Sequence, residues 1–170
     1  MAPGLSKALR AWQAVRACDS QANAATERAI NEGSDVTDQQ AIPSKPLQEE
    51  PALRTLAMPA DANPAGDIFG GWVLAQMDLA GALPAVRHSE GRVVTVAVEA
   101  MRFHQPIFIG DLVTCYAKIA KSGRTSMHSK IDTWVTRHRD GEEVLVTEGT
   151  FIYVAVDDRG QPRVLPSFKG

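Results

Sequence analysis

The sequence predicts an α+β domain in which a curved antiparallel sheet wraps around one long central helix. A single helical pattern of apolar residues runs from Trp72 to Val86. Beyond residue 90 the chain carries only long strand patterns, separated by hairpin turns. Segregation of the helix from the strands along the chain is typical of this fold class.

The folded domain is expected to begin near Ala52, after a segment that lacks large apolar side chains. Residues 31–51 consist mostly of Gly, Ser, Asp, Gln, Pro and Glu, so they bury too little surface to offset the entropy lost on ordering. We therefore assign residues 1–50 to a mobile N-terminal extension and linker, residues 51–160 to the domain, and residues 161–170 to a C-terminal tail.

The central helix is predicted to be buried on most of its sides. Six residues follow the spacing of one helix face, namely Trp72, Ala75, Leu79, Ala82, Leu83 and Val86. Val73, Leu74 and Met77 add apolar side chains on other faces. Gly81 weakens the helix unless a neighbour packs tightly against it. Pro84 is expected to kink or end the helix, because it lacks an N–H and clashes with the preceding turn.

Five strands are predicted around this helix. They are a short run from Leu53 that Pro59 ends and four long runs at Arg92–Phe103, Leu112–Ala120, Thr125–Thr136 and Glu143–Val156. In the first long run, one face is expected to carry Val94, Val96, Val98 and Ala100. Turns at Lys121–Arg124 and Arg139–Glu142 join the last three strands into an antiparallel meander. A single helix wrapped by such a sheet is the hotdog fold.

Composition excludes several classes of function. The net charge of −2 gives no reason to expect nucleic acid or an anionic membrane as a partner. No apolar run reaches the roughly 18 residues that a membrane span needs. An amphipathic pattern near the N-terminus resembles a targeting segment, but acidic residues from Asp19 onward argue against one. A cytoplasmic protein is therefore expected.

Cysteine and histidine patterns predict neither a disulfide framework nor a metal site. Cys18 and Cys115 are far apart, and Cys115 lies in an apolar run that is typical of a core. The four histidines show no paired ligand spacing. No serine lies in the Gly-x-Ser-x-Gly context of a serine hydrolase.

Asp67 is the candidate catalytic residue. It lies between two glycine-bearing turns, just before the apolar helix. The backbone N–H groups of Phe69, Gly70 and Gly71 at the start of that helix are candidates to bind a developing oxyanion. Asn63 either caps the turn or orients a substrate. A carboxylate beside such donors activates water or attacks a carbonyl directly, although an aspartate before a helix is also a common turn former.

Four sequence blocks resemble the YciA-like acyl-CoA thioesterases. The first runs from Asn63 to Trp72 and continues in Gln76-Met77-Asp78. The others are Gly91–Val98, the pattern from Pro106 to Gly110-Asp111, and Gly123–Ser126. The blocks lie within residues 53–156 in the order and spacing of that family, and residues 1–50 have no counterpart in it.

The resemblance implies a hotdog enzyme that hydrolyses acyl-CoA to a free acid and CoA, with Asp67 at the position of the catalytic aspartate. It implies homodimers that assemble further into hexamers, with active sites at the dimer interface. No cofactor is expected, because CoA is part of the substrate. Arginine suits bidentate contacts to phosphate, so we assign the CoA phosphate contacts to Arg124 and its neighbours Ser122, Gly123 and Thr125. Arg92 and Lys121 are weaker candidates for the same role.

Two other functions remain as alternatives. A non-catalytic acyl-CoA sensor would use the same fold, but a regulator is expected to carry a DNA-binding segment. The first 50 residues hold five basic and seven acidic side chains (5 − 7 = −2) and therefore no basic stripe. A hotdog hydratase or dehydratase is disfavoured, because its usual chemistry needs a histidine and no histidine lies in the loop before the helix.

Overall fold

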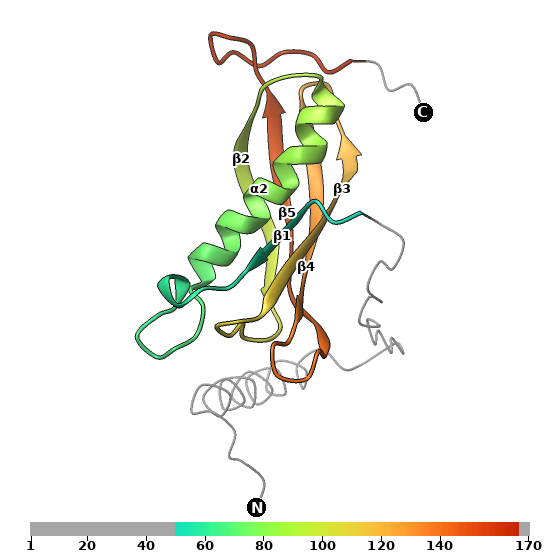
Figure 1. Cartoon of the computed structure of the whole chain (residues 1–170). Coiled ribbons are helices and arrows are strands. Elements are labelled where there is room, and N and C mark those ends of the chain that lie inside the picture. The colour runs from blue at the N-terminus through green and yellow to red at the C-terminus, as the bar shows by residue number, and fades with distance from the viewer. Residues whose placement is uncertain (1–49, 167–170) are drawn as a thin grey trace, which may run out of the picture. The chain divides into compact units, whose positions relative to one another are not determined.

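The computed structural model describes residues 50–166, which form a five-stranded antiparallel sheet and one long helix (Figure 1). The predicted extension over residues 1–50 therefore lies almost wholly outside the described residues, as does the end of the predicted tail. The elements in chain order are β1 (Leu53–Leu56), the 3₁₀ turn η1 (Pro59–Asp61), α2 (Gly70–Ser89), β2 (Val93–Phe103), β3 (Leu112–Ser122), β4 (Ser126–Thr136) and β5 (Glu143–Ala155).

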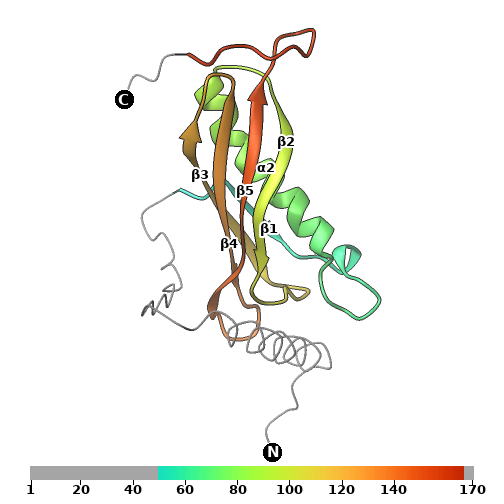
Figure 2. The same ribbon diagram turned by 180° about the vertical axis from the view of Figure 1, so that it is seen from behind.

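The sheet has the strand order β1-β3-β4-β5-β2, and α2 packs across one face of it (Figures 1 and 2). The predicted meander is confirmed, since β3 pairs with β4 and β4 with β5, both antiparallel. Strands β1 and β2 form the two edges of the sheet. The architecture is that of a hotdog fold, as the sequence predicts, and β2 keeps one edge without a strand partner within residues 50–166.

The predicted burial of α2 on most sides is wrong for the described chain. The residues that face the sheet are small or slender, and they are Val73, Met77, Ala80, Gly81, Ala85 and Ser89. Leu79, Leu83 and Val86 are 58%, 43% and 44% exposed on the opposite side. Small side chains let the helix approach the sheet closely, so they occupy the buried face and leave the large leucines outside.

Gly81 lies where α2 approaches the sheet most closely, as expected from its position in the helix. A Cβ atom at this position would come within 2.6 Å of Tyr153 Oη and 2.7 Å of Ile131 Cδ1. The Tyr153 hydroxyl also donates to the backbone oxygen of Asp78 at 2.8 Å. Pro84 does not end the helix, which continues to Ser89, because the packed face holds the chain helical past the missing N–H.

The single apolar face predicted for β2 is also wrong. Register shifts occur between Thr95 and Ala97 and between Glu99 and Arg102, and each bulge reverses the alternation of side chains. Val94 therefore faces away from α2 and pairs with Val154, whereas Val98 pairs with Phe151 of the core. Val96 and Val98 remain 55% and 41% exposed on the open edge.

Candidate active site

Asp67 lies in a tight turn between η1 and α2 that its own backbone and Asn63 hold together. The Asn63 side-chain oxygen accepts hydrogen bonds from the N–H of Ala65 at 2.9 Å and of Asp67 at 3.2 Å. The Asn63 N–H donates to the Asp67 carbonyl at 2.7 Å. Gly66 has a φ of +92°, a conformation that favours glycine. Asn63 thus shapes the turn, and its side-chain NH₂ is the group left for a substrate contact.

The Asp67 side chain is half-buried, and its carboxylate has no hydrogen-bond partner within residues 50–166. Asp67 lies three residues before the first residue of α2, Gly70, and Phe69 caps the helix without a side-chain hydrogen bond. The Phe69 N–H donates to the Asp61 carbonyl at 3.0 Å, and the Trp72 N–H donates to the Phe69 carbonyl at 3.0 Å. The Phe69 N–H is therefore not available to an oxyanion, because it already holds the turn.

Gly70 and Gly71 carry the remaining candidate donors. Their backbone N–H groups have no acceptor among the described residues, as expected for the first turn of a helix. Neither glycine has a positive φ. A Cβ atom at Gly71 would meet nothing within 4 Å, and one at Gly70 would only touch the Phe103 ring at 3.6 Å. The fold of this chain does not require glycine here, so the glycines leave bare backbone for another molecule to approach.

The loop over residues 106–111, called the 106–111 loop below, supports the Asp67 turn from behind. Asp67 forms a β-bridge with Phe108, and the Ile68 N–H donates to the Ile107 carbonyl at 3.1 Å. The loop is in turn held by an ion pair between Asp111 and Arg137. Sequence reasoning missed Arg137, because its contact with the loop depends on strand pairing and leaves no local motif.

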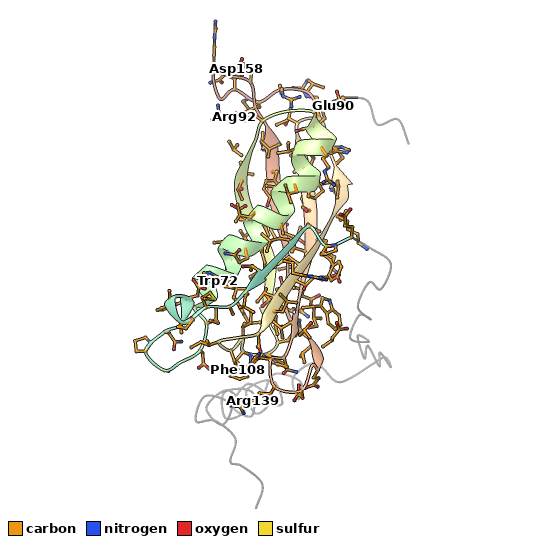
Figure 3. All side chains as sticks on the ribbon, viewed as in Figure 1. Trp72, Glu90, Arg92, Phe108, Arg139 and Asp158 are labelled. Atoms are coloured by element: carbon orange, nitrogen blue, oxygen red, sulfur yellow. The ribbon has the colours of Figure 1, made fainter. Side chains whose placement is uncertain are left out.

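The candidate CoA-binding residues lie at the other end of the domain. The hairpin Lys121–Thr125 joins β3 to β4 beside the last turn of α2, where His88 Nε2 lies 2.9 Å from Ser122 Oγ. Arg92 directly precedes β2 at the same end, far from Trp72 and Phe108 (Figure 3). Because α2 has 20 residues, about 30 Å of helix separates this end from Gly70. One chain does not bring Arg92 or Arg124 to Asp67.

Within the Lys121–Thr125 hairpin, some backbone groups already have hydrogen-bond partners, whereas several side chains remain exposed to a ligand. The Gly123 N–H donates to the Ser126 carbonyl at 2.8 Å, and the Arg124 carbonyl accepts from Leu165 at 2.9 Å. The Arg124 side chain is exposed, and its guanidinium has no partner in the described part of the chain. Arg124 is therefore the residue best placed to meet a phosphate, with Lys121 and Ser122 also exposed beside it.

Residues 50–166 contain no group of three or more His, Cys, Asp or Glu side chains that would hold a metal ion. They also contain no helix of the length and apolar character that a membrane crossing requires.

Comparison with known proteins identifies the family. Residues 65–142 match the family model of the thioesterase superfamily. The chain is 52% identical over 122 residues to the acyl-CoA thioester hydrolase YciA of Salmonella typhimurium, an alignment that covers 70% of this chain and 92% of the relative.

Solved structures agree with this assignment. A hexameric thioesterase from Yersinia pestis is 51% identical with a TM-score of 0.68, over 71% of this chain and 98% of that one. A hexameric hotdog fold thioesterase of Campylobacter jejuni is 40% identical with a TM-score of 0.67, over 69% of this chain and 91% of that one. The chain therefore belongs to the hotdog-fold acyl-CoA thioester hydrolases, the family of YciA.

Proposed function

We propose that this protein hydrolyses acyl-CoA at a site where the Asp67 turn of one subunit meets the CoA-binding hairpin of another. The observation that carries the proposal is the unpaired Asp67 carboxylate beside the bare N–H groups of Gly70 and Gly71. A thioester carbonyl seated there has a base or nucleophile on one side and oxyanion donors on the other.

Two routes fit these groups. In the first, the Asp67 carboxylate takes a proton from water, and the resulting hydroxide attacks the thioester carbonyl. The tetrahedral oxyanion accepts hydrogen bonds from Gly70 and Gly71, then collapses to the acid and CoA thiolate, which is protonated. In the second, Asp67 attacks directly, releases CoA and leaves a mixed anhydride that water hydrolyses. A single turnover in ¹⁸O-labelled water, with mass analysis of the Asp67 peptide, identifies the second route where the label enters Asp67, because water has then opened the anhydride at the Asp67 carbonyl. Trapping the anhydride with hydroxylamine tests the case in which water attacks the acyl carbonyl instead.

The open edge of β2 supports a site shared between subunits. Strand β2 begins at Val93, near the C-terminal end of α2, and finishes at Phe103, whose ring lies beside Gly70. If two β2 edges pair antiparallel about a two-fold axis, the Arg92 end of one chain comes to the Phe103 end of its partner. Arg92 and Arg124 of one subunit then approach Asp67 of the other.

Exposed apolar side chains favour a homo-oligomer. Val96 and Val98 on the β2 edge and Leu79, Leu83 and Val86 on α2 are all more than 40% exposed, and an unpaired apolar edge and helix face are unusual for a monomer. We propose a homodimer through β2 that assembles further to a hexamer, as the Yersinia pestis relative does. The free Cys115 thiol suits a reducing compartment, and the cytoplasm is the proposed location. No cofactor is needed in either route.

The test compares wild-type protein with Asp67→Asn on a panel of acyl-CoAs from acetyl to palmitoyl. We expect the substitution to lower kcat at least about 100-fold, because the amide neither accepts the proton nor attacks. Asp140→Asn is the matched control: it makes the same change in an exposed turn, where Oδ1 accepts from Glu142 N–H at 3.0 Å and an amide oxygen can replace it. Full turnover by Asp67→Asn would refute the proposal, and tight CoA binding without any turnover would favour the sensor.

A further inference from the structure

Asp111 and Arg137 are buried together behind the turn that carries Asp67. Their side chains are 3% and 11% exposed, and Arg137 Nη1 lies 2.5 Å from Asp111 Oδ2. Burying two charges is costly unless their donors and acceptors all find partners. The partners of this pair therefore indicate what it holds in place.

The partners of Asp111 and Arg137 lie in and next to the 106–111 loop. Asp111 Oδ2 also accepts from the Phe108 N–H at 3.0 Å, and Oδ1 accepts from the His138 N–H at 3.3 Å. Arg137 Nη1 donates to the Pro106 carbonyl at 3.0 Å. Its guanidinium lies over the Phe108 ring, 5.0 Å from the centroid. The ion pair thus fixes the start, the middle and the end of this loop.

The loop transmits this restraint to the candidate active site. Phe108 bridges to Asp67, and the Ile107 carbonyl accepts from the Ile68 N–H. We infer that Asp111 and Arg137 are positioning residues, which act through the backbone of Phe108 to hold Asp67 in register with the Gly70–Gly71 end of α2. The inference rests on the proposed function of Asp67.

The effect of losing this restraint is expected in the chemical step. Misplacing a catalytic group by about 1 Å can lower a rate about 100-fold. Within one chain, the candidate CoA-binding groups lie at the other end of the domain and do not contact the 106–111 loop. We therefore expect kcat to fall about 10- to 100-fold in Arg137→Met, with KM changed less than about threefold.

Three variants test whether the pair positions Asp67 or only stabilises the fold. Arg137→Met removes the charge and all the donors, whereas Arg137→Lys keeps a charge for Asp111 but loses the planar fork that also reaches Pro106. Lys130→Met is the control, since it removes an ion-pair partner of Asp132 (3.5 Å) on β4 without contact to the loop. All are assayed well below the Tm of each variant, so that folded protein is compared.

A double mutant links the effect to Asp67. If the pair acts through Asp67, adding Arg137→Met to Asp67→Asn lowers the residual rate no further. Arg137→Lys is expected to retain more kcat than Arg137→Met, and Lys130→Met to retain it all. If Arg137→Met does not fold, Arg137→Lys and its own double mutant decide the matter.

Three results would overturn the inference. They are an unchanged kcat in folded Arg137 variants, an equal loss in Lys130→Met, or the same fold-loss in the Asp67→Asn background. An Asp67→Asn variant with full activity would instead refute the proposed function itself, so the two failures are distinguishable.

Discussion

The Tyr153 hydroxyl occupies the space that a side chain at Gly81 would need. An ideal Cβ at Gly81 would lie 2.6 Å from Tyr153 Oη, closer than real Cβ contacts come. The same hydroxyl lies 3.1 Å from Asp78 Oδ1, which also accepts from Thr95 Oγ1 at 2.7 Å. The tyrosine is thus anchored in place beneath α2. Burial, together with the nearby Asp78 carboxylate, raises the pKa of Tyr153 far above its usual value, so the hydroxyl stays protonated and can donate.

Gly81→Ala is expected to destabilise the protein, although alanine favours a helix by about 1 kcal/mol over glycine. Overpacking against Tyr153 and Ile131 costs about 1–3 kcal/mol, because the Tyr153 hydroxyl is held by its hydrogen bond to Asp78 and the Ile131 side chain is fully buried. We expect a net loss of up to about 2 kcal/mol in the free energy of unfolding, measured in urea. The loss should be smaller in a Tyr153→Phe background, and an increase in stability would contradict the close packing.

Gly71→Ala is expected to separate stability from activity. A Cβ at Gly71 meets nothing within 4 Å, so the free energy of unfolding should stay within about 0.5 kcal/mol of wild type. If the N–H groups of Gly70 and Gly71 bind the oxyanion, a methyl group beside them hinders the substrate and kcat/KM should fall at least about tenfold. Unchanged hydrolysis of both short and long acyl-CoAs by this variant would exclude close approach at Gly71.

The strands could be predicted from the sequence, whereas the faces of two elements could not. Turn residues such as those at Arg139–Glu142 mark strand ends locally, so the bounds of β3, β4 and β5 were predicted to within about two residues. Which side of α2 is buried depends instead on how closely Ala80 and Gly81 let it approach the sheet. The bulge at Val96 has no signal in an alternating apolar run.

The candidate site also has features that the sequence could predict and features that it could not. The turn around Asp67 could be predicted, because Gly66 and Asn63 define it by local hydrogen bonds. The distance between Asp67 and Arg124 within one chain could not, because it depends on the length of α2 and on which strand edge stays open. Arg137 contacts Asp111 only because the pairing of β3 with β4 brings the two residues together, and no local sequence pattern indicates such a contact.

Because the Cys115 thiol is buried, we expect the free energy of unfolding to fall at alkaline pH. Burial, opposed slightly by a hydrogen bond with Thr133, raises the pKa of Cys115 from 9.0 to about 11. Between pH 9 and pH 11, the Cys115 thiol therefore stays protonated in the folded state but is deprotonated in the unfolded state. The contribution of Cys115 to the free energy of unfolding is complete below pH 9 and is lost as pH rises toward 11. We expect a decline of up to about 1.4 kcal/mol per pH unit above pH 9.

Urea unfolding at pH 8, 9 and 10 measures this decline. Cys115→Ser keeps a hydroxyl for Thr133 but does not titrate in this range, so its stability should fall less between pH 8 and pH 10 than that of wild type. Cys18→Ser serves as the matched control and should follow wild type. Equal declines in all three proteins would assign the alkaline sensitivity to other groups.

Mixed oligomers test whether one active site uses two subunits. Asp67→Asn and Arg124→Ala are each expected to be impaired in hydrolysis at low substrate concentration, the first in chemistry and the second in CoA binding. In a dimer that contains one of each, one site combines the intact Asp67 of one chain with the intact Arg124 of the other, and the second site carries both defects. Random mixing at equal amounts should therefore restore about a quarter of wild-type kcat/KM, since half of the dimers are mixed and each has one intact site.

If Asp67 and Arg124 acted within one chain, mixing would restore nothing, because every chain carries one defect. Co-refolding the two variants and comparing the mixture with each variant alone gives the measurement, and the same two variants combined without refolding give the baseline without subunit exchange. Since about 30 Å of helix separates the two residues within a chain, restoration is the expected result.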